Sequence, residues 1–175
     1  GDWSSDVCSS DLDIAMAIQN IFVVGAGLMG SGIAQNAITS GFDVTLNDKQ
    51  QAAVERAQVV IKKALAREVS KGRMTQEAMD EALTHLTVDS GMEGAKKADL
   101  VIEAIYENLE AKQAVFTELE DLCPAKTIFA SNTSSISLTA LAAATKRPSR
   151  VVGMHFFSPV PKMKLCEVKE KKRGI

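Results

Sequence analysis

Several residue types are scarce in this chain of 175 residues, and each scarcity excludes a class of protein. The three cysteines, Cys8, Cys123 and Cys166, have neither a paired nor a metal-ligand spacing, which argues against a disulfide scaffold or a zinc module. No apolar run approaches the roughly 18 residues that a membrane-spanning helix needs. These absences favour a reduced, cytoplasmic protein with no membrane partner.

The chain also lacks an excess of either charge. Its formal net charge is −2 and its pI is about 5.8, so neither nucleic acid nor a membrane surface is indicated as a partner. Hydrophobic residues make up 46% of the sequence, which is enough to bury a core. The length allows one domain, or one domain and a fraction of another.

The first twelve residues, GDWSSDVCSSDL, show no periodicity and have neither the basic start nor the apolar centre of a signal peptide. Codons for residues 6–11 match a common sequencing adapter, so residues 1–12 are interpreted as a translated library artefact, with Met16 as the natural start. The alternative is an ordinary disordered tail. We therefore expect residues 1–15 to be a non-native or disordered tail and residues 16–175 to form the domain.

Short β-branched runs alternate with amphipathic stretches along the remaining chain. Strands are expected at 21–24, 43–46, 86–88, 100–104, 127–130, 151–155 and 163–168. Helices are expected at 28–40, 50–71, 109–122 and 138–144, with another that begins at Thr75. Because strands separated by helices need crossover connections, the pattern predicts an α/β fold with a mainly parallel sheet.

The stretch IFVVGAGLMGSGIAQ, at residues 21–35, contains the spacing G-x-G-x-x-G at Gly25, Gly27 and Gly30. The motif alone is weak, but here it follows a predicted strand and opens a predicted helix, which is the context that it requires. The first glycine permits a tight turn, the second lets the backbone approach a pyrophosphate, and the third lets helix and strand pack closely. The sequence therefore predicts a Rossmann-type doubly wound domain that binds a dinucleotide.

Asp48 ends the second predicted strand, at the distance from the central glycine where an acid accepts hydrogen bonds from a ribose 2′-hydroxyl. This favours NAD over NADP, although the neighbouring Lys49 could tolerate a phosphate. Asp48 could instead cap the following helix, and FAD is a further option for the cofactor.

Other polar candidates also follow predicted strands: the segment from Glu103 to Glu107, the cluster SNTSS at 131–135, and His155. Ligands gather at the carboxyl ends of strands in an open parallel sheet, so these side chains are expected near the dinucleotide. The only other histidine, His85, is expected to be structural. Glu167, on the next strand, could orient the ring of His155, or it could be a surface residue among lysines.

Several motifs in order resemble the L-3-hydroxyacyl-CoA dehydrogenase family, most closely its stand-alone bacterial type. They are FVVGAGLMGSGIAQ, NDK, EAIYENLEAKQAVFTELE, ASNTSSIS and GMHFFSPVPKMKLCEV, and together they run from about Met16 to Val168. The resemblance implies NAD-dependent oxidation of a 3-hydroxyacyl-CoA, 3-hydroxybutyryl-CoA being expected, or the reverse reduction, in fatty-acid or butyrate metabolism.

The resemblance also implies roles for individual residues. His155 would be the general base, Glu167 would orient it, and Ser134 would bind the reacting oxygen of the substrate. The hairpin over about 50–84 would help to hold coenzyme A, with Lys71 as a candidate for a phosphate. The cofactor-binding residues would be Gly25, Gly27, Leu28, Met29, Gly30, Asp48, Glu107, Lys112, Asn132 and Ser158.

The sequence departs from the family pattern in two places. Ser158 stands where the family has an asparagine that helps to place the nicotinamide. The chain also stops without the family's helical C-terminal domain, which supplies another catalytic asparagine and forms a homo-oligomer. The alternatives are an inactive NAD-binding fragment and a crystallin-like structural relative. A related β-hydroxyacid dehydrogenase, with a lysine base, is disfavoured by the segment HFFSP.

Overall fold

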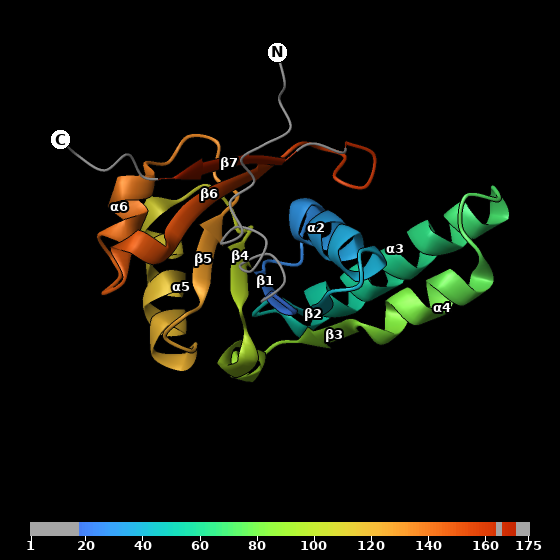
Figure 1. Cartoon of the computed structure of the whole chain (residues 1–175), viewed down its shortest axis with the longest axis horizontal. Coiled ribbons are helices and arrows are strands. Elements are labelled where there is room, and N and C mark those ends of the chain that lie inside the picture. The colour runs from blue at the N-terminus through green and yellow to red at the C-terminus, as the bar shows by residue number, and fades with distance from the viewer. Residues whose placement is uncertain (1–17, 164–165, 171–175) are drawn as a thin grey trace, which may run out of the picture.

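The computed structural model of the chain describes residues 18–163 and 166–170 (Figure 1). The expected tail at 1–15 and the expected start at Met16 lie outside the described residues. Within these residues one seven-stranded sheet runs in the order β3-β2-β1-β4-β5-β6-β7. Its strands are β1 (Asn20–Val24), β2 (Asp43–Asn47), β3 (Leu86–Asp89), β4 (Leu100–Glu103), β5 (Ile128–Ser131), β6 (Val151–Phe156) and β7 (Cys166–Glu170).

The first six strands of the sheet are parallel, which confirms the predicted α/β class. Only the last strand, β7, pairs antiparallel, with β6. Its predicted start at residue 163 was wrong, because the N–H groups of Lys162 and Met163 both donate to the carbonyl of Pro159, each at 3.0 Å. These bonds close a turn, and β7 begins beyond it at Cys166.

Helices follow most strands. They are α2 (Leu28–Thr39), α3 (Gln51–Ser70), α4 (Gln76–Thr84), α5 (Leu109–Leu122) and α6 (Leu138–Ala142), with short 3₁₀ turns η1 (Glu93–Lys97) and η2 (Pro148–Arg150). Three of the helices begin with a side-chain cap. Thr75 accepts a hydrogen bond from the N–H of Ala78, Asn108 accepts one from that of Ala111, and Ser137 accepts one from that of Ala140.

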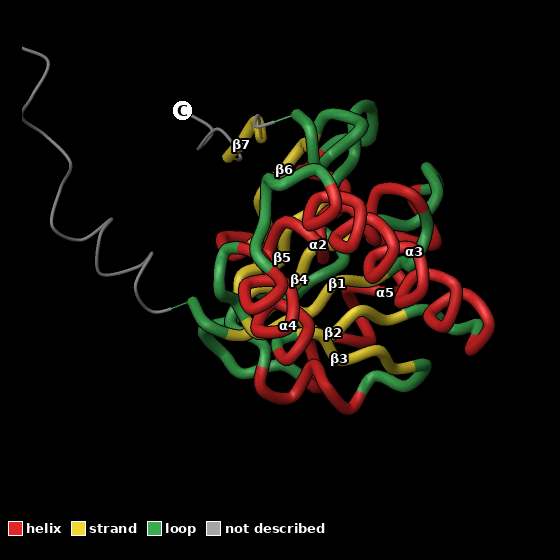
Figure 2. Tube along the Cα trace, turned by 90° about the vertical axis from the view of Figure 1, so that its right-hand side faces the viewer, coloured by secondary structure: helices red, strands yellow, loops and turns green. Residues whose placement is uncertain are grey.

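The sheet is covered on both faces, as Figure 2 shows for the helices that surround it. Alternate residues of one strand enter different cores: Ile21 and Val23 pack with α2, α3 and α4, whereas Phe22 and Val24 pack with η1, α5 and α6. Because both faces of β1 are buried, its side chains are apolar on both sides, which explains the continuous apolar run in the sequence.

Helices α3 and α4 form a hairpin that projects beyond β3, on the opposite side of the molecule from β6 and β7 (Figure 1). The inner side of α3 buries Val54, Ala57, Ile61 and Leu65, a spacing of three or four residues. This is the hairpin that the resemblance implied over about 50–84.

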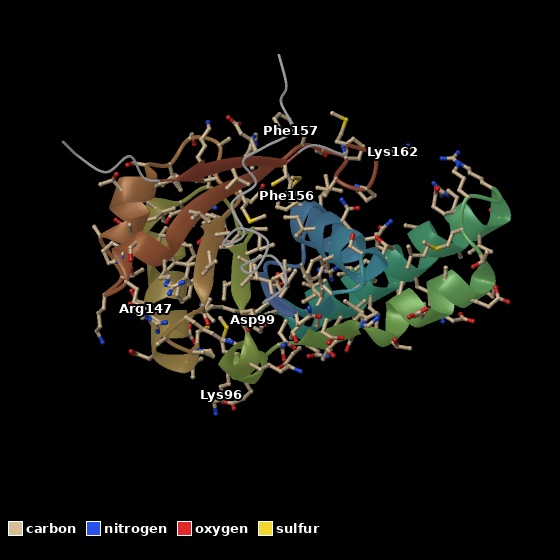
Figure 3. All side chains as sticks on the ribbon, viewed as in Figure 1. Lys96, Asp99, Arg147, Phe156, Phe157 and Lys162 are labelled. Carbon is tan, nitrogen blue, oxygen red and sulfur yellow. The ribbon has the colours of Figure 1, made fainter. Side chains whose placement is uncertain are left out.

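Asp99 fastens the amino-terminal end of β1 at the lower edge of the sheet (Figure 3). Its Oδ2 atom accepts hydrogen bonds from the N–H groups of Gln19 (3.1 Å) and Asn20 (3.0 Å), and Lys126 lies 3.5 Å from Oδ1. Burial by itself would raise the pKa of Asp99, but the hydrogen bonds from Asn20 and Gln19 and the charge of Lys126 together lower it.

Asp99→Asn is therefore expected to lower the free energy of unfolding at neutral pH by about 1 kcal/mol. Because the pKa is lower in the folded state, the stabilisation by Asp99 is present above the ordinary aspartate pKa and is lost as the pH falls through the folded-state value. Urea denaturation at pH 7 and pH 3 measures this. An undiminished difference between the two proteins at pH 3 contradicts the prediction.

Candidate dinucleotide and acid–base site

The glycine turn between β1 and α2 has the geometry that its sequence predicts. Gly25 has φ +103° and donates its N–H to the carbonyl of Asn47 at 2.8 Å. A Cβ atom at Gly30 would lie only 1.6 Å from the carbonyl oxygen of Gly25, so helix and turn touch backbone to backbone. At Gly27, by contrast, a Cβ would meet nothing within 4 Å.

The exposed Gly27 is also the N-cap of α2, and it makes no side-chain cap. The first N–H groups of a helix have no partner inside the helix, and they carry a partial positive charge. Open space over Gly27 leaves them accessible. The turn can therefore receive an anionic group such as a pyrophosphate.

A first cavity, of about 600 Å³, opens beside this turn at the carboxyl ends of the strands. Gly25, Gly27 and Asp48 line it, together with Val24, Asn47, Lys49, Gln50, Met92, Ala104, Ile105, Tyr106, Ala111, Ala114 and Val115. Ile105, Ala111, Ala114 and Val115 form an apolar part of its wall. This composition suits a flat, apolar ring with polar groups at one edge.

Both carboxylate oxygens of Asp48 accept hydrogen bonds from backbone N–H groups. Oδ2 accepts the N–H of Ala26 in the glycine turn, and Oδ1 accepts the N–H of Gln50, the N-cap residue of α3, each at 3.0 Å. The side chain thus joins the turn to the start of α3 and also lines the first cavity. A carboxylate has about four acceptor positions, so two remain for a ligand.

A second cavity, of about 370 Å³, adjoins the first along Ala104, Ile105 and Tyr106, which line both. It brings together six of the residues singled out in the sequence. They are Met29, Glu107, Asn132, Ser134, His155 and Ser158. The second cavity is lined by residues of α2 and β6 and of the loops that follow β4, β5 and β6. Because the two cavities share three residues, they form one trench along the strand ends.

The half-buried His155 lies near the end of β6, and its ring packs against that of Phe157 with centroids 4.9 Å apart. The next residue of the strand, Phe156, donates its N–H to Oδ1 of Asn132 at 2.9 Å. Figure 3 shows Phe156 and Phe157 together at this end of the strand. Asn132 therefore holds the end of β6 beside the loop that carries Ser134.

Glu167 stands directly opposite His155 in the β6–β7 ladder, at a register position that faces the histidine. Its carboxylate lies 3.3 Å from Nζ of Lys169, and within the described part of the chain it makes no hydrogen bond to the imidazole. The structure thus makes the two residues cross-strand neighbours without joining their side chains.

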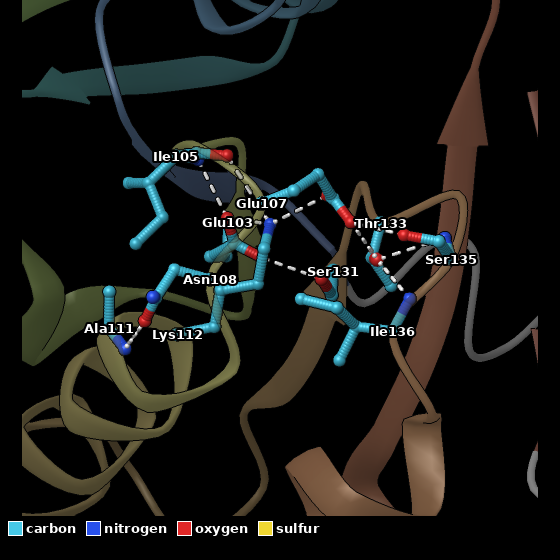
Figure 4. Close-up of polar contacts among 10 residues, drawn as sticks. All are labelled: Glu103, Ile105, Glu107, Asn108, Ala111, Lys112, Ser131, Thr133, Ser135 and Ile136. Carbon is cyan, nitrogen blue, oxygen red and sulfur yellow. Dashed lines mark hydrogen bonds and ion pairs between the residues drawn. The ribbon is translucent and has the colours of Figure 1, made fainter.

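A buried ion pair lies behind the second cavity (Figure 4). Nζ of Lys112 is 2.7 Å and 2.9 Å from the two oxygens of Glu103, and the two side chains are 1% and 0% exposed. The hydroxyl of Ser131 and the N–H of Ile105 also donate to this carboxylate, at 2.5 Å and 2.6 Å. Three donors thus converge on the carboxylate of Glu103 at the end of β4.

Lys112 connects this pair to Glu107, whose Oε1 lies 3.3 Å from Nζ. The other oxygen of Glu107 accepts hydrogen bonds from Thr133 (2.8 Å) and Ser135 (3.0 Å). Ser134 stands between these two residues, is exposed, and lines the second cavity. The network therefore fixes the loop on both sides of Ser134.

A third hollow, the hairpin groove, has a volume of about 710 Å³ and lies between α2, α3 and the turn at 159–161. Leu28 lines it, as do two cations that no sequence motif indicated, Arg56 and Arg67. Lys71, the predicted phosphate ligand, is the C-cap of α3 and is absent from the lining of this groove.

The 159–161 turn, which forms one wall of the hairpin groove, packs on α2. Nδ2 of Asn36 donates to the carbonyl of Val160 at 3.1 Å, and a Cβ at Gly32 would lie 2.9 Å from Cβ of Val160. Val160 is buried. The turn at 159–161 is thus seated closely on the helix.

Two negative findings apply to the described residues, 18–163 and 166–170. They include no group of three or more His, Cys, Asp or Glu side chains placed to hold a metal ion. None of their helices has the length and apolar content needed to cross a membrane.

The fold and the trench define this part of the chain as an α/β dinucleotide-binding domain. Residues 20–174 match the family model for the 3-hydroxyacyl-CoA dehydrogenase, NAD binding domain, and the chain belongs to this family. The cofactor of the domain is NAD. The open space over Gly27 and the uncapped start of α2 fit a pyrophosphate, and the adjoining cavities leave room for the groups on either side of it.

Comparison with known proteins gives the same family. The chain is 48% identical over 153 residues to the probable 3-hydroxybutyryl-CoA dehydrogenase of Bacillus subtilis, covering 87% of this chain and 53% of that protein. It resembles the crystal structure of 3-hydroxybutyryl-CoA dehydrogenase from Escherichia coli with a TM-score of 0.84 at 44% identity, over 86% of this chain and 32% of that one.

The crystal structure of (S)-3-hydroxybutyryl-CoA dehydrogenase from Ralstonia eutropha also matches with a TM-score of 0.84, at 39% identity, over 87% of this chain and 54% of that one. The chain spans about half the length of the curated 3-hydroxybutyryl-CoA dehydrogenases that it matches, at 53% and 52% for the relatives in Bacillus subtilis and Clostridioides difficile.

Proposed function

We propose that the protein catalyses NAD-dependent oxidation of an L-3-hydroxyacyl-CoA, with 3-hydroxybutyryl-CoA as the expected substrate, to the 3-ketoacyl-CoA, and the reverse reduction. The observation that carries the proposal is that His155 and Ser134 line the cavity that adjoins the glycine turn. A hydroxyl and an imidazole beside a dinucleotide trench are the groups that alcohol oxidation needs. The free thiols of Cys123 and Cys166 support a cytoplasmic setting.

In the proposed reaction, NAD held on the glycine turn would supply the acceptor for the hydride that leaves C3 of the substrate. His155 takes the proton of the 3-hydroxyl group as the carbonyl forms, because imidazole titrates close to neutral pH. The hydroxyl of Ser134 donates a hydrogen bond to the same oxygen. Glu167, directly opposite His155 in the β6–β7 ladder, is the proposed partner that orients the ring.

The hairpin groove is the proposed seat of the coenzyme A moiety. Arg56 and Arg67 supply positive charge for its phosphates, and Leu28 and Val60 supply apolar surface. Lys71, on the turn of the hairpin one helical turn beyond Arg67, would add a further charge for a phosphate that extends past the groove. The 159–161 turn lines the groove, and the preceding residue, Ser158, lines the second cavity. The acyl chain would pass over this segment from the groove to the second cavity.

Asp48 is proposed to recognise the adenosine ribose. Asp48→Asn is expected to weaken NADH binding about 5- to 30-fold, equivalent to about 1–2 kcal/mol for a charge-assisted hydrogen bond. It should weaken NADPH binding less, because the carboxylate also repels a 2′-phosphate. Fluorescence titration with both cofactors measures the two affinities.

Asp43→Asn, at the other end of β2, is the matched control and should change neither affinity. Equal losses for NADH and NADPH in Asp48→Asn would instead assign Asp48 to the support of the glycine turn, through its bonds to Ala26 and Gln50.

The activity itself is tested by mixing the chain with NADH and acetoacetyl-CoA and following NADH absorbance. Consumption of NADH that depends on acetoacetyl-CoA is the expected result. Saturable NADH binding without any reduction contradicts catalysis by this chain and leaves the alternative of an NAD-binding fragment.

A further inference from the structure

The charges around the second cavity are unevenly distributed. Glu107 is the only carboxylate among the described residues that line it, and no lysine or arginine is among them. His155 and Tyr106 are the other titratable side chains there. A ligand in this cavity therefore meets the charge of Glu107 before any other fixed charge.

Glu107 is held in its ionised form. Burial alone would raise its pKa, but the hydrogen bond from Thr133, the charge of Lys112 and the hydrogen bond from Ser135 outweigh that effect and lower the pKa. The carboxylate is thus an anion throughout the neutral range, and its bonds to both sides of the 133–135 loop fix its position.

The nearby cation does not cancel this charge. Nζ of Lys112 is closer to both oxygens of Glu103, at 2.7 Å and 2.9 Å, than to Glu107, at 3.3 Å. Glu103 and Lys112 are both fully buried and neutralise each other, so the three side chains together carry one negative charge. That charge lies on Glu107, the member of the three with an exposed side chain.

We propose that Glu107 sets the redox preference of the bound cofactor, by favouring the cationic nicotinamide ring of NAD⁺ over the neutral ring of NADH. The inference rests on the proposed function, which seats the nicotinamide in the cavity with His155. Both cofactor forms have the same phosphates and adenosine, so a fixed anion at this end of the trench acts on the difference between them. The bound NAD⁺/NADH couple therefore has a lower midpoint potential, and is a weaker oxidant, than it would be without Glu107.

The test compares the dissociation constants for NAD⁺ and NADH. Glu107→Gln retains an oxygen for Thr133 and Ser135 and removes the charge. The ratio of the NAD⁺ to the NADH dissociation constant is expected to rise about fivefold to tenfold, the effect of a partly screened unit charge several ångströms away at an effective dielectric constant of about 20. A tenfold change corresponds to an upward shift of about 30 mV in the midpoint potential of the bound couple.

Two further variants separate charge from structure. Glu110→Gln removes an exposed charge from the first turn of α5, outside the cavity lining, and should leave the ratio unchanged. Glu107→Asp retains the charge and should keep the ratio near that of the wild type even if both affinities fall. Isothermal titration with NAD⁺ and fluorescence titration with NADH supply the constants.

The possible outcomes are distinct. An equal loss of affinity for both forms in Glu107→Gln, or an unchanged ratio, overturns the inference and reduces Glu107 to a support for the loop. A ratio that moves in Glu110→Gln as far as in Glu107→Gln overturns it too. Failure of the wild-type chain to bind either form overturns the proposed function, and the inference with it.

Discussion

Lys112→Met is expected to lower the free energy of unfolding by about 3–5 kcal/mol, because it leaves the carboxylate of Glu103 buried without its cation. Methionine has nearly the length of lysine, so the packing of α5 against the sheet would be largely retained. Glu103 is 0% exposed, and Ser131 and Ile105 provide its remaining donors. Two neutral hydrogen bonds do not replace a buried charge partner. Urea denaturation gives the free energy difference.

Lys126→Met is the matched control for this variant. Its ammonium group pairs with Asp99 at 3.5 Å but is 70% exposed, and exposed pairs contribute about 1 kcal/mol or less. The double variant Glu103→Gln/Lys112→Met removes both charges and should be more stable than Lys112→Met alone, which a double-mutant cycle measures. A Lys112→Met protein as stable as the wild type contradicts the prediction.

His155→Ala is expected to reduce the rate of acetoacetyl-CoA reduction by about 10²- to 10⁴-fold, the usual contribution of a positioned acid or base. In the proposed reaction, run in this direction, His155 supplies the proton that the substrate oxygen receives. The half-buried ring packs on Phe157 near the end of an outer parallel strand, so its loss should leave the fold and NADH binding nearly unchanged. Steady-state rates and NADH titration of the same preparations separate chemistry from binding.

His85→Ala controls for the loss of an imidazole elsewhere. His85 pairs with Asp43 through Nδ1 at 2.8 Å, at the amino-terminal edge of the sheet, away from the trench. This variant should retain the wild-type rate. A His155→Ala protein that still reduces acetoacetyl-CoA at a comparable rate removes His155 from the mechanism.

The sequence was most informative where local geometry determines the residue. Gly25 needs a positive φ, and Gly30 has no room for a Cβ, so the glycine turn could be predicted together with its strand and helix. Parallel strands bring their carboxyl ends to one edge, which is why Ser134 and His155 could be expected in one cavity although they are far apart in the chain.

The buried ion pair was harder to predict, since charge usually indicates exposure. A signal was nevertheless present, because Lys112 falls on the same helical stripe as Val115, Phe116 and Leu119, all of which are buried. Glu103 likewise ends an apolar strand, LVIE. Arg56 and Arg67 of the hairpin groove carried no comparable signal, because the residues that line it depend on how α2, α3 and the 159–161 turn are placed in space.

The seat of the 159–161 turn on α2 has a mechanical consequence. Val160 packs on Gly32, and Asn36 holds its carbonyl, only one to two helical turns from the backbone that faces the pyrophosphate. Helix and turn therefore move as a single piece. A shift of α2 would thus carry the 159–161 turn with it and, through that turn, one wall of the hairpin groove.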